Sequence, residues 1–162
     1  MPKFQNQTIV VPFDFSAPSQ NALHQILNWA DDSNKIHLVH VIIPTPTIVD
    51  INPPVWLPPD LDTDARDAML DRMKEEYSTG PYSNLIHHCL IGDPGSEIVR
   101  IAEEEKADMI IMPSHGRSGI SRFFLGSVAE RVLRLAQCPV TVLRGSKFES
   151  DQAKVEAISE TA

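Results

Sequence analysis

A polar, glycine-punctuated loop between two apolar segments is the part of this chain best suited to bind a ligand. Residues 108–113 form an apolar run of strand length, and residues 127–137 repeat apolar side chains at helical spacing. Between them, residues 114–119 are polar and rich in glycine, and Gly126 precedes the helical segment. A loop that leaves the carboxyl end of a buried strand and ends at a helix start gathers backbone amides at the positive end of the helix dipole, which favours a phosphate group. The segment therefore predicts an anion-binding site.

Alternating strand-like and helix-like segments must position this loop. Strands are predicted at residues 8–12, 35–43, 84–91, 108–113 and 139–143, and helices at 16–30, 62–79, 97–106 and 127–137. Strand and helix alternation implies right-handed crossovers and a mainly parallel sheet. We therefore expect an α/β fold: one domain over residues 1–145 with a doubly wound, five-stranded parallel sheet and helices on both faces.

Two segments stand apart from this pattern. Residues 44–60 contain six of the chain's 13 prolines, so no regular element is expected there. This segment is either a mobile excursion or a partly ordered flap or partner surface, the latter favoured by Ile51 and Trp56. Residues 146–162 are polar and mildly acidic, which predicts a disordered tail.

The overall composition excludes several classes of partner. A net charge of −8 and a pI near 5.1 oppose binding to nucleic acid or to an anionic membrane, because both surfaces repel an acidic protein. The apolar runs are too short to cross a bilayer, and no continuous apolar segment of a signal peptide precedes the first strand. We therefore expect a cytoplasmic protein.

The cysteines and histidines predict no protein metal site. Cys89 and Cys138 lack Cys-x-x-Cys spacing and are expected to be buried thiols. His40 is expected to be a core histidine with a hydrogen-bond partner. His87 and His88 alternate across a predicted strand, so they cannot both face one metal ion.

The glycine loop resembles the nucleotide loop of the universal stress protein family. In ATP-binding members of that family the loop reads Gly, two residues, Gly, nine residues, Gly, then Ser or Thr. Here Ser114-His115-Gly116, nine residues and Gly126-Ser127 match that pattern, and Pro113 replaces the first glycine. The resemblance implies the strand order 3-2-1-4-5, with the break in winding between strands one and four. Ligands of such sheets bind at that break, outside the carboxyl ends of the strands.

The resemblance also implies which residues contact a nucleotide. The nucleoside side comprises Pro12, Phe13, Asp14, Val41, Met112 and Pro113. The backbone of Val41 would read the adenine edge, while Met112 and Pro113 would lie under the nucleoside. Asp14 would place an acidic group near the nucleoside, and its alternative role is that of a carboxylate favoured by the dipole of the following helix.

The phosphate side comprises Ser114, His115, Gly116, Arg117, Gly126, Ser127 and Val128. Gly116 would leave room for phosphate, and the helix start would offer amides and a hydroxyl. Arg117 and Arg122 either bind the outer phosphates or are simply solvated, and His115 either contacts phosphate or packs on the loop.

The sequence favours binding over catalysis. It contains neither a Gly-x-Ser-x-Gly elbow nor the Gly-Lys-Ser/Thr of a P-loop, and no base for an attacking water is evident. The expected ligand is ATP, with Mg²⁺ or Mn²⁺ carried by its phosphates, in a regulatory protein that signals to an unknown partner. The alternatives are a family member that does not bind ATP and acts through dimerisation, and a slow ATP hydrolase. A homodimer is expected through the edge strand at residues 139–143, as the family usually forms.

Overall fold

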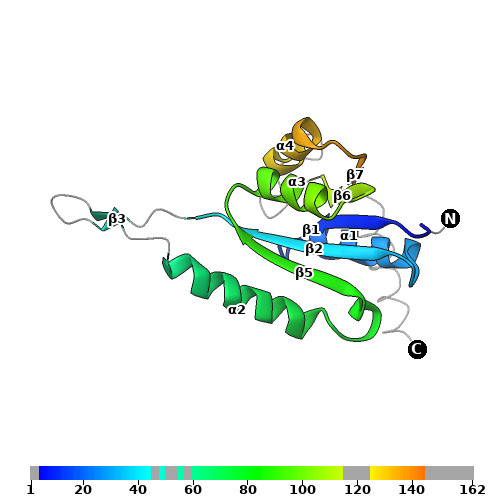
Figure 1. The fold of residues 1–162 in the computed structure, drawn as a ribbon, viewed down its shortest axis with the longest axis horizontal. Coiled ribbons are helices and arrows are strands. Elements are labelled where there is room, and N and C mark those ends of the chain that lie inside the picture. Colours follow the sequence, from blue (N-terminus) through cyan, green and yellow to red (C-terminus); the bar gives the residue numbers. More distant parts are fainter. Residues whose placement is uncertain (1–3, 45–47, 50–54, 57–59, 115–124, 145–162) are drawn as a thin grey trace, which may run out of the picture.

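The computed structural model describes residues 4–44, 48–49, 55–56, 60–114 and 125–144, and it is built on one five-stranded parallel sheet (Figure 1). The strands are β1 (Thr8–Pro12), β2 (Lys35–Ile42), β5 (Leu85–Ile91), β6 (Met109–Pro113) and β7 (Val140–Leu143). Their order is β5-β2-β1-β6-β7, with every neighbouring pair parallel. This confirms the predicted sheet and its strand order.

Helices cover both faces of the sheet, as the alternation predicts. They are α1 (Ala17–Trp29), α2 (Asp60–Glu76), α3 (Pro94–Glu104) and α4 (Ser127–Leu135), with a short 3₁₀ turn, η1 (Gly80–Tyr82), after α2. Successive residues of a strand face opposite sides, so Ile9 and Val11 of β1 pack with α1 and α2, whereas Val10 packs with α3 and α4. Figure 1 shows the sheet between these two helical layers.

Helix α3 begins three residues before its predicted start. Asp93 is its N-cap and accepts a hydrogen bond from the backbone N–H of Ser96 at 2.9 Å. Pro94 then occupies the first helical position, where its missing N–H leaves no hydrogen bond unmade. The prediction treated the Gly-Asp-Pro-Gly-Ser turn as a loop, but its aspartate and proline form a helix start.

The prediction that residues 44–60 contain no regular element is wrong. β3 (Ile48–Val49) and β4 (Val55–Trp56) pair in an antiparallel arrangement, and α2 begins at Asp60. Each of these two-residue strands consists of β-branched or aromatic residues, which favour β-structure. The prolines lie outside the paired positions, so they do not prevent the pairing. Figure 1 shows the pair projecting away from the main sheet between β2 and α2. The tail at residues 146–162 lies outside the described residues.

The central strands part at the end of the sheet where the site is expected. β1 pairs with β2 in register from Thr8–Lys35 to Pro12–Val39, but with β6 only at Ile9–Met109 and Val10–Ile110. Beyond those positions the two strands have no registered pair, so the carboxyl end of the sheet opens between β1 and β6. This is the break in winding at which doubly wound sheets bind ligands.

Candidate functional site

The two ends of the glycine loop meet at the carboxyl edge of the sheet. The backbone N–H of Gly126 donates to the carbonyl of Ser114 at 2.8 Å, and the N–H of Ser114 donates to the carbonyl of Leu143 at 2.9 Å. The start of α4 is therefore anchored beside the end of β6. Ser114 is buried, whereas Ser127 is exposed and Gly126 and Val128 are half-buried. His115, Gly116, Arg117 and Arg122 lie outside the described residues.

The amino end of α4 lacks the side-chain cap that the other two capped helices possess. Ser16 caps α1 and Asp93 caps α3, each by accepting a backbone hydrogen bond. Gly126, the N-cap of α4, makes no such bond. Its φ of −67° and ψ of 151° are open to any residue, so glycine is not needed there for a left-handed backbone. The first amides of α4 are therefore oriented toward a ligand or solvent.

The turn after β1 fixes Asp14 through local contacts. The carboxylate of Asp14 accepts hydrogen bonds from the backbone N–H and the hydroxyl of Ser16. Asp14 is thereby bonded to Ser16, the N-cap residue of α1. The N–H of Phe13 donates to the carbonyl of Val39 at 2.8 Å, and Nδ1 of buried His40 donates to the carbonyl of Phe13 at 2.7 Å. His40 is thus a hydrogen-bonded core histidine, as expected.

Phe15 adopts a positive φ of 62° in the same turn. Such a conformation is strained for a bulky residue and persists only when the surroundings hold it. The ring of Phe15 contacts the rings of Phe13, His40 and Tyr77, and the guanidinium carbon of Arg72 lies 4.4 Å from its centroid. Aromatic packing therefore fixes the path of the chain that follows β1.

A cavity of about 600 Å³ opens at the same edge of the sheet, between the amino ends of α3 and α4. It is lined by Ile43, Pro44, Gly92, Asp93, Pro94, Gly95, Ser127, Val128, Glu130, Arg131 and Arg134. Of the residues predicted for the site, it includes Ser127 and Val128. Val41 lies two residues before Ile43, at the end of β2. The remaining described candidates, Pro12, Phe13, Asp14, Met112, Pro113, Ser114 and Gly126, do not line it.

The α3 wall of this cavity was missed by sequence reasoning. Gly95 is buried against Arg131 of α4, and a Cβ on Gly95 would lie 2.7 Å from the Arg131 side chain. Arg131 Nε also pairs with Asp93 Oδ1 at 2.7 Å, and its Nη2 donates to Ser96 Oγ. The available signal was the pair of glycines directly after a predicted strand, which marks close backbone approach.

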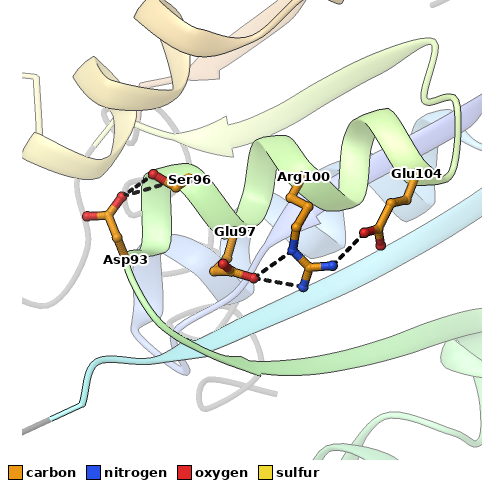
Figure 2. A network of polar contacts seen from close by, with 5 residues as sticks. All are labelled: Asp93, Ser96, Glu97, Arg100 and Glu104. Carbon is orange, nitrogen blue, oxygen red and sulfur yellow. Dashed lines mark hydrogen bonds and ion pairs between the residues drawn. The ribbon is translucent and has the colours of Figure 1, made fainter.

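Charges along α3 are largely paired with one another. Figure 2 shows the guanidinium of Arg100 between Glu97 and Glu104, at 2.7 and 2.6 Å, with Asp93 bonded to Ser96 at the helix start. Hydrogen bonds from the hydroxyl and the N–H of Ser96 hold the pKa of the Asp93 carboxyl below its usual value. Among the residues that the structure describes, Arg134 is the cation lining the cavity that has no recorded ion pair.

The cysteines are free thiols. Cys89 is buried and Cys138 is half-buried, so the prediction of two buried thiols is correct for Cys89 only. Burial raises the pKa of the Cys89 thiol to about 11. Burial also raises the pKa of the Cys138 thiol, so neither thiol is activated as a nucleophile.

His87 and His88 face opposite sides of the sheet, as their alternation predicts. His87 Nε2 donates to the carbonyl of Tyr77 on the α2 side, at 2.8 Å. His88 instead contacts His37 of β2. The sequence offered no signal for this second contact, because it depends on the register of β2 against β5.

No described helix has the length and apolar character needed to span a bilayer.

Comparison with known proteins places this architecture in a family. Residues 5–144 match the model of the universal stress protein family. The chain is 33% identical to the universal stress protein MJ0531 of Methanocaldococcus jannaschii over 153 residues. This alignment covers 87% of this chain and 84% of that protein. A universal stress protein solved in complex with cAMP has the same fold, with a TM-score of 0.60, 23% identity and coverage of 88% and 100% of the two chains. A family protein of Arabidopsis thaliana with AMP bound gives a TM-score of 0.51, 17% identity and coverage of 88% and 94%.

Proposed function

We propose that this chain, which belongs to the universal stress protein family, binds ATP at the carboxyl ends of β1, β2 and β6 and acts as a nucleotide-responsive regulatory protein. The observation that carries the proposal is the hydrogen bond from Gly126 to Ser114, at 2.8 Å. It anchors the uncapped amino end of α4 at the point where β1 and β6 part. Backbone amides and the helix dipole then converge where phosphates would lie.

Under this proposal Gly126 is a glycine because phosphate approaches its backbone closely. Its φ and ψ do not require glycine, so a conformational reason is lacking. The hydroxyl of Ser127 and the amide of Val128 would complete the contacts, with Arg134 as a nearby cation. Mg²⁺ or Mn²⁺ would enter with the phosphates of the nucleotide.

The adenine and ribose would lie toward β1 and β2. Two proteins of the same fold were solved with cAMP and with AMP, which share an adenosine moiety with ATP. Val41 would offer its backbone to the adenine edge, and Asp14 would keep the turn after β1 in place through its bonds to Ser16. Asp14 would therefore affect nucleotide binding indirectly, by holding the conformation of the turn after β1.

The proposal describes a binding protein that works in the cytoplasm as a homodimer. β7 is an edge of the sheet, so its outer backbone groups are open to pairing with a second copy. Nucleotide occupancy would change the surface that a signalling partner reads.

Nucleotide retention and calorimetry test the proposal. Mass spectrometry of the ligand released from purified protein should identify an adenine nucleotide, and titration with ATP should give saturable binding. Gly126→Val should abolish that binding because a branched side chain obstructs the phosphate. Gln137→Val is the matched control, since it adds the same side chain at an exposed position after the other end of α4.

Two results would count against the proposal. If Gly126→Val and the control bind ATP with equal affinity, the phosphate does not bind at the start of α4. Continuous release of phosphate from bound ATP would show that the protein is a slow hydrolase and not only a binding protein.

A further inference from the structure

Three potential metal ligands from separate elements converge on the α3 face of the sheet. His37 belongs to β2, His88 belongs to the edge strand β5, and Glu105 is the C-cap residue of α3. One nitrogen from each imidazole and one carboxylate oxygen all lie within 4.8 Å of one another. The two imidazoles are also hydrogen-bonded to each other, between His37 Nδ1 and His88 Nε2 at 2.9 Å, and the rings stack with their centroids 5.1 Å apart.

One nitrogen of this cluster is buried without a hydrogen bond. The His37 side chain is 3% exposed, and its Nε2 has no hydrogen-bond partner among the residues that the structure describes. The nearest acidic atom is Oε2 of Glu105 at 3.8 Å, which is too long for a hydrogen bond. Buried polar atoms are nearly always satisfied, so this nitrogen points to a missing partner between it and the carboxylate.

We propose that His37, His88 and Glu105 bind a divalent transition-metal ion, with Zn²⁺ as the best fit. Two imidazoles and one carboxylate form a ligand set that suits Zn²⁺ and leaves a position for water. Ligand bonds of about 2.0–2.2 Å require the three atoms to move closer together. The Glu105 side chain is 40% exposed and is free to rotate inward, while the stacked imidazoles already lie close together.

The surrounding groups favour binding. Burial is the main cause that lowers the pKa of both His37 and His88, which favours the neutral imidazole, the form that binds a metal. The nearby Arg100 does not bridge to Glu105, because Glu97 and Glu104 hold its guanidinium (Figure 2).

This proposed metal site is distinct from the cavity between the amino ends of α3 and α4. Glu105 follows the carboxyl end of α3, whereas the cavity lies at the amino end of that helix. Eleven helical residues separate the two ends by roughly 16 Å. A metal ion here would link β2, the edge strand β5 and the end of α3, so its role is structural and does not depend on nucleotide binding.

The test uses the full chain stripped of metal with a chelator. Zn²⁺ is titrated against a chromophoric competitor, and Co²⁺ is added separately to record the visible absorption of a bound ion. The wild type should bind one ion per chain tightly and show the Co²⁺ bands. His88→Gln and Glu105→Gln should each weaken binding by at least roughly tenfold and lose the bands. His24→Gln and Glu103→Gln, which alter an exposed histidine and an exposed carboxylate elsewhere, should leave both unchanged.

The outcomes separate the metal site from a hydrogen-bonded histidine pair. Absence of Co²⁺ bands in the wild type would overturn the proposal, and so would unchanged Zn²⁺ affinity in either ligand variant. Glu105 is exposed, so Glu105→Gln should fold even if His88→Gln does not, as circular dichroism will show.

Discussion

Pro113, the one departure from the family's loop pattern, should have little effect on nucleotide affinity. It closes β6 opposite Leu143 of β7, as expected for a proline at a strand end. The N–H of Ile110 donates to Pro139, directly before β7, and the N–H of Ser114 donates to Leu143 of β7, so the backbone nitrogen at position 113 faces the β1 side. The registered pairing of β1 with β6 ends at Ile110, so an N–H at Pro113 would have no strand partner.

The size of the effect follows from what Pro113→Gly adds. The new N–H offers at most one net hydrogen bond to a nucleotide, about 0.5–1.5 kcal/mol, or roughly two- to thirteen-fold in affinity. Glycine also gives the unfolded chain more freedom, so the variant should lose about 0.4–1 kcal/mol of stability. Pro113→Ala separates the two effects, because it restores the N–H with less added freedom.

Calorimetry with ATP and urea denaturation measure both quantities. The dissociation constants of wild type, Pro113→Gly and Pro113→Ala should agree within that factor. The reasoning is refuted if the wild type binds no ATP while both variants bind it. In that case Pro113 disables the site and the chain is a family member that does not bind ATP.

Three further predictions concern the dimer and the fold. The carbonyls of Pro139 and Leu143 accept hydrogen bonds from Ile110 and Ser114, so the N–H of Val142 faces the open edge of β7. Val142→Pro should therefore weaken self-association in sedimentation, whereas Val142→Thr, which keeps the N–H, should not. Ser16→Ala removes the cap of α1, a 3.4 Å bond, and should cost about 0.5–1 kcal/mol in urea denaturation; a loss near zero would assign the cap no energetic role. Met73 is fully buried in α2, so Met73→Ala should destabilise the protein by about 2–5 kcal/mol and Met73→Leu by less than about 1.5 kcal/mol; equal losses would contradict its place in the core.

Local patterns were sufficient to predict the sheet but not the contacts between its elements. Buried runs such as residues 108–113 and the helical spacing of residues 127–137 gave the alternation, and the loop resemblance gave the strand order. The start of α3 was misplaced because Asp93 and Pro94 belong to both a turn and a helix cap. The β3–β4 pair was missed because proline content outweighed four strand-forming residues.

The proximity of the two ends of the glycine loop was predictable from one local motif. The motif predicts that Ser114 and Gly126 belong to one loop, and their hydrogen bond agrees. The glycines after β5 signal a close approach at Gly95, but the residue that approaches it, Arg131, depends on how α3 packs on α4. Likewise, His37 and His88 are 51 residues apart, and only the β2–β5 register brings them together.

The amide shifts of α4 test the central claim most directly. In a two-dimensional nitrogen–proton NMR titration with Mg²⁺ and ATP, the backbone amides of Gly126, Ser127 and Val128 should shift in a saturable manner. The capped start of α1 provides an internal comparison, since its side-chain cap already satisfies an N–H that α4 leaves open. Saturable shifts elsewhere in the protein, with these three amides unmoved, would contradict the claim that the start of α4 binds phosphate.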